Sequence, residues 1–339
     1  MTITIRDVAQ AAGVSTATVS RALRGLPNVD DHTRRKVQQA AADLDYVISP
    51  SASRLASGRT GSVAVITPYI ARWFFSTVLS GVESVLANAG IDLLLMSVSN
   101  PSGQLRLPPA PRLRRRVDGA LVIAIPADDR ELLDILDLGM PTSMIGVSVA
   151  GVPSVTIDDV QASRTATQHL VNLGHRRIGL IAGTPTSLPY TAGYDRRRGF
   201  IEVLDEAGLE FEPSLESYGY FTIEGGERAM TDLLNQPTRP TAVFAMSDEM
   251  AFGAIRAMRN HGLQPGRDIS IVGIDGHAVA ELLDLTTVAQ PVQDLGRIAA
   301  EALLDQLNGR AEADHQLVQR LATQLIVRGS TAPFAASVD

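Results

Sequence analysis

The stretch that decides the fold spans residues 4–23 and reads TIRDVAQAAGVSTATVSRAL. Thr4, with Asp7 three residues later, resembles the capping box found at a helix start. Gly13 interrupts the apolar stripe that follows, and glycine can supply the positive φ of a tight turn. Ser15 is then a natural N-cap for a second helix that ends near residue 24. Two short helices joined by a glycine-bearing turn predict a helix-turn-helix.

The second helix has one apolar face and one polar face. Its inward positions have the i, i+3, i+4 spacing of a buried stripe, namely Val19, Ala22 and Leu23. Its outward positions are small, polar or cationic, namely Thr16, Ala17, Thr18 and Arg21. Such an outer face can enter the major groove of DNA without steric conflict.

A third helix is expected from Asp30 or Asp31 to about Asp45. Its first turns carry three cations, Arg34, Arg35 and Lys36. Cations at this end oppose the helix dipole, so a phosphate partner explains them better than helix stability does. A solvated charged face is the alternative.

The charge of the chain is unevenly distributed. The 339 residues carry a net charge of −7. Residues 1–60 hold eight Lys or Arg and five Asp or Glu, which gives +3, so the remainder carries −10. A basic head on an acidic body is expected of a phosphate-binding module on a solubilised carrier. Chance variation in a short segment is the alternative.

The N-terminal stretch is similar, nearly residue for residue, to the DNA-binding headpiece of the LacI/GalR family of transcriptional regulators. The similarity is carried by TIRDVA at residues 4–9, AGVS at 12–15 and ATVSRAL at 17–23. It implies a repressor that binds a palindromic operator in double-stranded DNA as a homodimer. With residues 1–48 as the headpiece, the predicted DNA-binding residues are Thr4, Ser15, Thr16, Ala17, Thr18, Arg21, Asn28, Arg34, Ala52 and Leu55.

Residues 49–60 are predicted to form a hinge. Pro50 stands at a helix N1 position and Gly58 at a C′ position, with only about two turns between them. A helix this short is marginal without a partner. The resemblance implies that two hinge helices pack in the minor groove, with Leu55 as the wedge and Ala52 at the helix contact. A flexible Ser/Gly-rich linker is the alternative.

Beyond residue 61, short β-rich apolar runs alternate with helical segments. The runs are 63–67, 91–97, 119–125, 142–146, 155–157, 177–182, 217–220, 242–245 and 269–274. This alternation predicts parallel α/β sheets, and about nine strands are better housed in two doubly wound halves than in one. The predicted fold class is therefore α/β, with a helix-turn-helix headpiece and two doubly wound parallel-sheet lobes.

This body, residues 61–330, resembles the periplasmic-binding-protein-like core of the same family. The resemblance implies three crossings between discontinuous lobes. Lobe 1 is expected at about 61–160 and 290–322, and lobe 2 at about 161–289 and 323–330. No heptad repeat follows residue 323, so a dimer is expected rather than a tetramer held by a coiled coil.

Aromatic side chains gather after the first strand of the body. Residues 68–75 read PYIARWFF, although Phe, Trp and Tyr make up only 4% of the chain. Ligands of open α/β sheets bind beyond the carboxyl ends of strands, so we expect Tyr69, Trp73 and Phe74 to stack on an effector. The alternative, strongest for Phe75, is that the rings staple the following helix to the core.

Polar groups follow the strand ends of the second lobe. The resemblance implies effector contacts for Arg196, Phe221, Ser247, Asp248 and Asp275. An arginine and carboxylates that face one cleft fix hydroxyl groups through charged hydrogen bonds. Asp248 also stands where a helix N-cap is wanted. Asp158 and Asp159 lie at the crossover and could be either hinge caps or ligand groups, and we count Asp158 among the predicted effector contacts.

Residues 100–116 depart from the family pattern. They read NPSGQLRLPPAPRLRRR where the family usually has a helix. Pro108, Pro109 and Pro111 each lack the amide donor that a helix needs. We expect this face of lobe 1 to be altered, and part of the dimer surface with it.

Two other functions compete with a regulator. A transporter's solute-binding protein is compatible with the body, but the headpiece and the lack of a signal-peptide pattern oppose it. An α/β enzyme would be expected to show a catalytic motif. The sequence has no Gly-x-Ser-x-Gly elbow, no phosphate-binding glycine-lysine loop and no His-Glu-x-x-His. We therefore expect no enzymatic activity, cofactor or metal.

The composition of the chain limits where the protein is expected to work and which class of effector it is expected to bind. The chain has no cysteine, which excludes a disulfide framework and thiolate zinc sites. No apolar run approaches the roughly 20 residues of a membrane span, so we expect a cytoplasmic protein without membrane contact. The aromatic and carboxylate lining favours a sugar or sugar derivative over a purine. Release and promotion of DNA binding by the effector are both compatible with the sequence.

Overall fold

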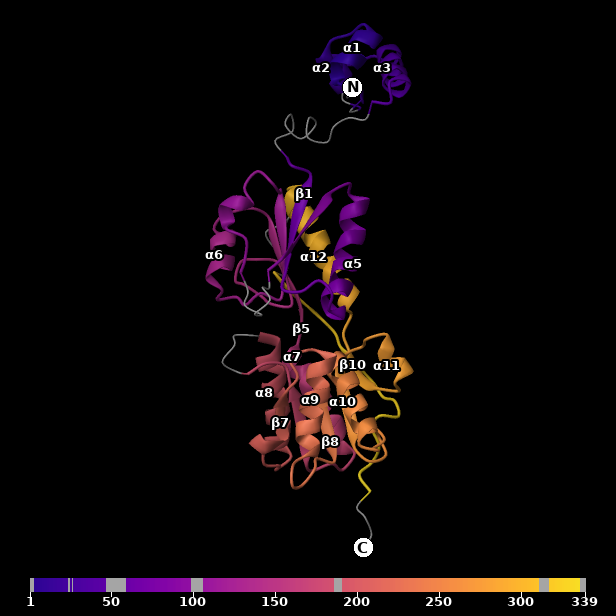
Figure 1. Cartoon of the computed structure of the whole chain (residues 1–339). Helices are drawn as coiled ribbons and strands as arrows, with labels where there is room; N and C mark the ends of the chain where they lie inside the picture. Colours follow the sequence, from indigo (N-terminus) through magenta and orange to yellow (C-terminus); the bar gives the residue numbers. More distant parts are fainter. Residues whose placement is uncertain are drawn as a thin grey trace. The chain divides into compact units, whose positions relative to one another are not determined.

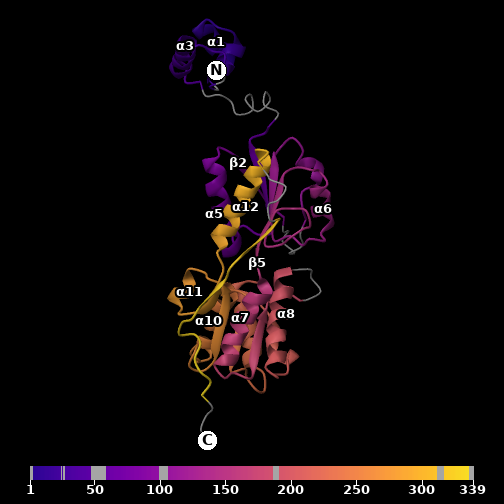
Figure 2. The ribbon, with the colours of Figure 1, turned by 180° about the vertical axis from the view of Figure 1, so that it is seen from behind.

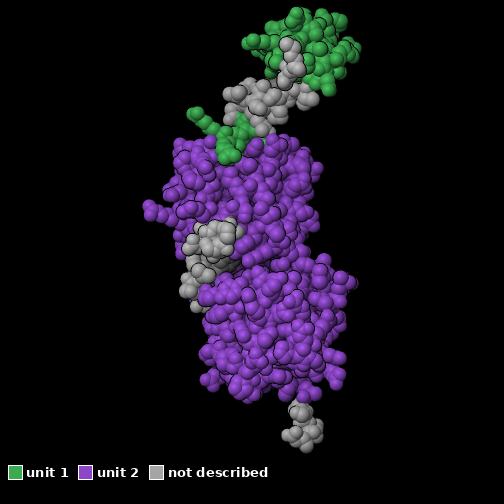
Figure 3. Space-filling view, viewed as in Figure 1, with its two compact units in different colours: residues 1–61, 115–118 green, residues 62–114, 119–339 purple. Residues whose placement is uncertain are grey.

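The computed structural model describes residues 3–23, 25, 27–46, 59–98, 106–185, 191–310 and 317–335. The chain divides into two compact units, which are coloured separately in Figure 3. One comprises residues 1–61 with 115–118, and the other comprises 62–114 with 119–339.

In its described residues, the first unit has three helices (Figure 1). They are α1 (Ile5–Ala12), α2 (Thr16–Leu23) and α3 (Asp31–Asp43), which pack on a small core of valine and alanine side chains. The carboxylate of Asp7 accepts hydrogen bonds at 2.7 Å from both the backbone N–H and the hydroxyl of Thr4. Gly13 ends α1 with a φ of 63°, which glycine adopts without steric cost. The predicted helix-turn-helix is therefore confirmed.

The second unit contains two six-stranded sheets. The first sheet has the order β11-β5-β4-β3-β1-β2 and is entirely parallel. Its strands are β1 (Ser62–Thr67), β2 (Asp92–Ser97), β3 (Gly119–Ile123), β4 (Thr142–Ile145), β5 (Ser154–Ile157) and β11 (Val318–Leu321). In this sheet β1 lies between β2 and β3, so the winding reverses beside it.

The second sheet has the order β12-β10-β9-β8-β6-β7. Its strands are β6 (Ile178–Ala182), β7 (Glu216–Tyr218), β8 (Ala242–Ala245), β9 (Ser270–Asp275), β10 (Thr286–Ala289) and β12 (Gln324–Ile326). All its pairings are parallel except that of β10 with β12. Here β6 lies between β7 and β8, so both sheets are doubly wound, as predicted.

Helices flank each sheet (Figures 1 and 2). In the first lobe α5 (Trp73–Asn88) and α12 (Val292–Leu307) pack together, and α6 (Arg130–Leu136) lies on the other side of the sheet. In the second lobe α7 (Asp159–Asn172) pairs with α8 (Thr191–Glu206), and α9 (Ile223–Leu234) pairs with α10 (Asp248–Asn260). The short helices η1 (Ala110–Arg112), η2 (Pro213–Leu215) and α11 (Val279–Leu282) complete the unit.

The chain crosses between the two sheets three times. It passes from β5 through α7 to β6, from β10 through α12 to β11, and from β11 directly to β12. Figure 2 shows the last crossing as the yellow segment that runs from one lobe to the other. Three backbone connections therefore join two lobes that are each discontinuous in sequence.

The number of strands differs from the sequence-based expectation. Twelve strands occur in the described ranges where about nine were expected, because β10, β11 and β12 are short and carry Thr, Gln or Arg. The described part of the Pro-rich segment, residues 106–117, has no α-helix and contains only the 3₁₀ turn η1. Most of the predicted hinge, with Ala52 and Leu55, lies outside the described residues. In the described ranges no helix is long and apolar enough to cross a bilayer.

The contact between α5 and α12 depends on two glycines. A Cβ on Gly81 would lie 2.1 Å from the carbonyl oxygen of Gln293, and a Cβ on Gly296 would lie 2.1 Å from that of Val78. Neither backbone can accept a methyl group without separating the helices. This close approach places the C-terminal helix of lobe 1 against the helix that follows β1.

We predict that Gly296→Ala lowers the free energy of unfolding by about 1–3 kcal/mol because the new methyl group overpacks the helix contact. Gly193→Ala in α8 is the matched control, since its Cβ would have no neighbour nearer than 3.8 Å. That control should be neutral or slightly stabilising, because alanine is the better helix former. Thermal unfolding of both variants checks the prediction, and equal melting temperatures would contradict it.

Candidate functional site

A cavity lies between the two lobes, at the carboxyl ends of their strands. It encloses about 730 Å³ that protein atoms do not fill, part of which is open to solvent. The first lobe contributes Phe74, Ala124 and Gly146 to the lining, and the second contributes Arg196 and Asp275 among others. The position agrees with the general rule for open α/β sheets.

Arg196 is the central charged group of this cavity. It is 6% exposed, and its Nε donates to Oδ1 of Asp159 at 2.8 Å. Its second donor group reaches the backbone carbonyl of Met246, and Oδ1 of Asp275 lies 3.8 Å from the guanidinium. The cation therefore connects the start of α7, the end of β8 and the end of β9. A buried cation held by two carboxylates can still offer donors to a polar ligand.

Asp275 lines the cavity beside Arg196 and is 6% exposed. Its Oδ1 accepts a hydrogen bond at 2.8 Å from the amide nitrogen of Gln290. Burial raises the pKa of Asp275 to about 8, although Arg196 acts in the opposite direction. Its backbone has a φ of 141°, which side-chain-bearing residues rarely adopt. Asp275 thus combines an unusual backbone with a carboxyl group that titrates near neutral pH.

Phe221 forms an aromatic wall that a glycine makes possible. Phe221 and the preceding Tyr220 both have a φ of 54°. A Cβ on Gly183, which follows β6, would lie 2.0 Å from the Phe221 ring. Only glycine at this position lets the ring lie against the backbone after β6. The predicted effector residue Phe221 therefore lines the cavity, in a space that the missing side chain of Gly183 leaves open.

The aromatic segment of the first lobe is divided between two roles. Phe74 lines the cavity, as does Phe75, which was expected to staple the helix. Trp73 instead packs on His277 of the second lobe, with ring centroids 4.5 Å apart. Tyr69 lies under the guanidinium of Arg72, 3.6 Å from its ring centroid. In the described part of the chain, Tyr69 and Trp73 do not line the cavity, so our expectation of direct stacking is not supported for them.

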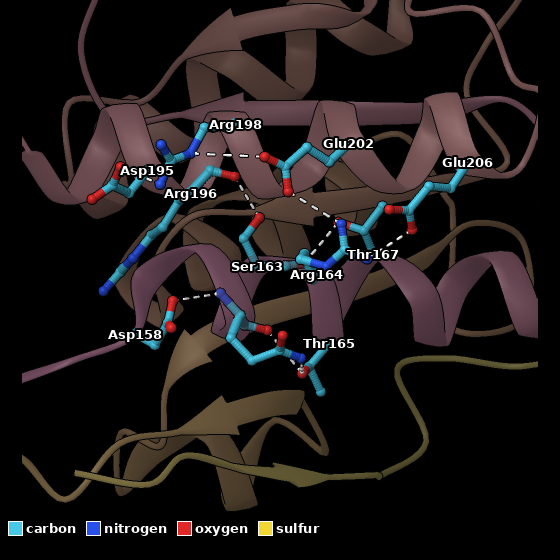
Figure 4. Close-up of polar contacts among 11 residues, drawn as sticks. Asp158, Ser163, Arg164, Thr165, Thr167, Asp195, Arg196, Arg198, Glu202 and Glu206 are labelled. Atoms are coloured by element: carbon cyan, nitrogen blue, oxygen red, sulfur yellow. Dashed lines mark hydrogen bonds and ion pairs between the residues drawn. The ribbon is translucent and has the colours of Figure 1, made fainter. Parts of the chain in front are cut away.

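The two carboxylates at the crossover also differ in role. Asp158 caps α7, because its Oδ1 accepts from the backbone N–H of Gln161 at 2.9 Å (Figure 4). It lines a neighbouring polar hollow rather than the cavity. Asp159 faces the cavity and pairs with Arg196. Burial raises the pKa of Asp159, against the effect of Arg196. Asp158, the predicted effector residue, thus caps α7, whereas its neighbour Asp159 lines the cavity.

Ser247 and Asp248 also differ from each other in role. Ser247 is the N-cap of α10 and lines the cavity, whereas Asp248 is fully buried behind it. Asp248 accepts from the hydroxyl of Thr287 at 2.7 Å and from the backbone N–H of His277 at 2.8 Å. Burial raises its pKa to about 6. Asp248 thus supports the segment after β9, and the N-cap of α10 is its neighbour Ser247.

Sequence reasoning missed several cavity residues. Arg72 and Glu249 line it from the two lobes, and burial raises the pKa of Glu249 while Arg72 lowers it. Gln290 follows β10, a strand too short and polar to be recognised. The strand-end rule would have found Gln290 once β10 was known. Among the described residues, no group of three or more His, Cys, Asp or Glu side chains could hold a metal ion.

The headpiece residues predicted to contact DNA fall into two groups. Thr16, Ala17 and Arg21 are exposed on α2, and Asn28 is exposed with a φ of 68°. The other three are engaged at the starts of helices α1 and α2. The hydroxyl of Thr4 donates to Asp7, and the hydroxyl of Ser15 lies 2.9 Å from that of Thr18. Their side chains are therefore partly engaged before any DNA is present.

Arg34 has internal partners rather than a free cationic head. Its guanidinium donates to the backbone carbonyls of Ala22 at 3.1 Å and Val29 at 3.4 Å. These bonds satisfy the end of α2 and the loop before α3. A structural role thus accounts for Arg34, whereas Arg35 and Lys36 stay exposed.

Two family models match the chain. Residues 4–49 match bacterial regulatory proteins of the lacI family. Residues 167–331 match a periplasmic binding protein-like domain. The first matched region contains the helix-turn-helix, and the second contains most of the second lobe and its crossings.

Similar proteins cover nearly the whole chain. It is 34% identical to the HTH-type transcriptional repressor CytR of Escherichia coli (strain K12), over 97% of this chain and 96% of CytR. The solved transcriptional regulator CelR–cellobiose complex matches with a TM-score of 0.69 and 33% identity, over 97% of this chain and 100% of CelR. The lac repressor dimer bound to operator and the anti-inducer ONPF matches with a TM-score of 0.86 and 28% identity, over 98% and 100%.

The raised pKa of Asp275 predicts a pH effect on stability. The folded state binds this proton more tightly than the unfolded chain, so stability falls as pH rises from about 4 towards 8. Asp248 acts in the same direction, but only up to about pH 6. We predict that Asp275→Asn makes the fall in melting temperature between pH 6 and pH 8.5 shallower than in the unmodified protein. Asp205→Asn, at an exposed position of α8, is the control. Parallel curves for all three proteins would contradict the assignment.

Proposed function

Since this chain belongs to the LacI family of bacterial regulatory proteins, we propose that it represses transcription by binding an operator as a homodimer under the control of a sugar-like effector. The observation that carries the proposal is the combination, in one chain, of an exposed helix-turn-helix face and a charged cavity between two lobes. A solute-binding protein would need only the second of these. The chain is a regulator of the family rather than an enzyme, like the relatives described above.

DNA recognition is assigned to the outer face of α2. Thr16 and Ala17 are small enough to let the helix approach base edges, and Arg21 can make a bidentate contact with a guanine. Arg35 and Lys36, exposed at the start of α3, are placed to contact phosphates. Ala52 and Leu55 are proposed to act in the minor groove when two hinges meet. Recognition by two copies of one chain requires an operator with two-fold symmetry.

The cavity fits a hydroxyl-rich ligand. Arg196 offers charged donors, and the carboxyl groups of Asp159 and Asp275 offer further polar partners for hydroxyl groups in a buried site. Phe74 and Phe221 offer flat apolar surfaces of the kind that sugar rings stack on. CelR was solved with cellobiose, so a relative of this chain takes a sugar. We extend that class to this protein, which we place in the cytoplasm with its DNA.

Control by the effector follows from the position of the cavity. Its lining comes from both lobes, so a ligand that contacts Phe74 and Arg196 together has a different affinity for each lobe arrangement. An effector changes the affinity for DNA only through that difference. DNA in turn changes the affinity for the effector by the same factor. A change at lobe 1 then reaches residues 59–61, which connect it to the hinge.

We predict that Arg21→Ala weakens binding to an operator selected from random DNA by about 1–3 kcal/mol and relaxes base preference at one position of each half-site. Arg35→Ala is the comparison variant. Removal of a phosphate contact should weaken binding to all sequences alike and reduce the salt dependence by about one unit per contact. Gel-shift titrations on matched and mutated operators separate the two effects. Unchanged base preference in Arg21→Ala would remove it from base readout.

We predict that Asp275→Ala abolishes the thermal shift produced by the effector while leaving operator binding intact. A thermal-shift screen of sugars, nucleosides and small metabolites identifies the ligand first. Asp205→Ala, an exposed carboxylate on α8, should keep the full response. A full ligand response in Asp275→Ala would place the effector outside this cavity.

A further inference from the structure

The described part of the Pro-rich segment carries a cluster of exposed arginines that the proposed function does not use. They are Arg106, Arg112, Arg114, Arg115 and Arg116, and no acidic residue stands among residues 106–117. We call this set the arginine patch. Within the described residues, no ion pair or hydrogen bond joins any of the five guanidinium groups to a carboxylate. These cations therefore have no partner in the described chain that explains them.

The patch is displayed on an ordered support. Leu107, Leu113 and Val117 are 2%, 0% and 7% exposed, so buried side chains anchor the segment between the arginines and after the last of them. The backbone N–H of Leu107 also donates to the Glu131 carboxylate at 2.6 Å. Arg115 has a φ of 61°, a conformation that costs a non-glycine residue energy. The fold holds these cations at the surface against that cost.

The patch is linked to the residues that lead from the core to the hinge. Asp118 follows Arg116 by two residues. Its two carboxylate oxygens accept from the backbone N–H groups of Thr60 and Gly61 at 2.6 and 2.7 Å. The end of the patch is therefore fixed to the backbone from which the hinge departs.

The headpiece is tethered to this same backbone by a short stretch of chain. The described chain ends at Tyr46 on the headpiece side and resumes at Arg59 on the core side, so that only residues 47–58 intervene. Twelve residues therefore join the headpiece to the backbone that Asp118 binds.

Charge singles out the patch from the rest of the core. Residues 61–339 carry a net charge of −10, yet five of their 22 cations fall within eleven consecutive positions. A dense group of arginines on an acidic body concentrates positive potential at one place, and the phosphate backbone of DNA is the polyanion that the proposed function brings to this protein. Arginine also suits phosphate, because its planar fork can bind two oxygens at once.

We propose that the arginine patch is a second DNA-binding surface, through which the core holds backbone phosphates of the same DNA that the headpiece reads. This inference rests on the proposed function, since it requires operator binding by α2. The patch adds affinity that does not depend on base sequence, because phosphate contacts carry no base information. In a dimer the contribution occurs twice, once for each copy of the segment.

The test compares the full-length protein with the triple variant Arg114→Gln, Arg115→Gln, Arg116→Gln. Operator affinity is titrated across a series of salt concentrations for both proteins. The plot of log affinity against log salt should become shallower by about 0.9 for each phosphate that the variant no longer neutralises, up to about five units for a dimer. Base preference at the operator should stay unchanged. Ethylation interference should show which phosphates the arginines bind.

Two further variants keep the test decisive. Arg176→Gln, Arg239→Gln, Arg267→Gln removes the same charge from exposed positions of the second lobe and should leave the salt dependence as it is. Arg114→Lys, Arg115→Lys, Arg116→Lys keeps the charge and should retain most of the salt dependence. A lysine variant that weakens binding as much as the glutamine variant would overturn the proposal, since the effect would then be structural.

The remaining outcomes separate this inference from the function on which it rests. An unchanged salt dependence in the glutamine variant, with base preference still sensitive to Arg21→Ala, would overturn the patch alone and favour an acidic protein as its partner. An unmodified protein with no base preference at any DNA would instead overturn the proposed function, and the patch with it.

Discussion

The cavity depends on one buried cation. Arg196 is held by Asp159 at the start of α7, by the carbonyl of Met246 after β8, and by the nearby Asp275 at the end of β9. Removing one partner of a buried ion pair costs roughly 3–5 kcal/mol, because the other charge is left uncompensated. The backbone of α8 can reach α7 because Gly199 has no side chain, since a Cβ there would lie 2.4 Å from the Val160 carbonyl oxygen. The group that fixes these elements relative to one another is thus also the group that faces a ligand.

The sequence predicted elements better than it predicted which way neighbouring side chains point. The helix-turn-helix could be recognised because capping, turn and apolar spacing all agreed in residues 4–23. The family resemblance pointed to Arg196, Phe221 and Asp275, and all three line the cavity. Adjacent carboxylates were a harder case: a helix start turns Asp158 towards its own backbone and Asp159 towards the cavity. Sequence spacing gives no sign of that rotation, and the same holds for Trp73, whose ring packs on the distant His277.

Three residues with strained backbones line the cavity. Ala124 on one lobe and Phe221 and Asp275 on the other all have φ between 49° and 141° and line the same space. Each such residue costs of order 1–3 kcal/mol and persists only where packing over-determines it. The packing is visible at Gly183, which leaves room for the Phe221 ring, and at Gln290, which bonds Asp275. The strain therefore places side chains at the lobe boundary that an unstrained chain would direct elsewhere.

The link between core and hinge follows from a single side chain. Asp118 immediately precedes β3 and also binds the backbone of Thr60 and Gly61, immediately before β1. The starts of two adjacent strands of lobe 1 are therefore tied to the segment that leads to the hinge. The arginine patch ends two residues before Asp118, so its cations are carried by the same backbone. An effector that shifts lobe 1 would then act on hinge and patch together, which gives one conformational change two routes to the DNA.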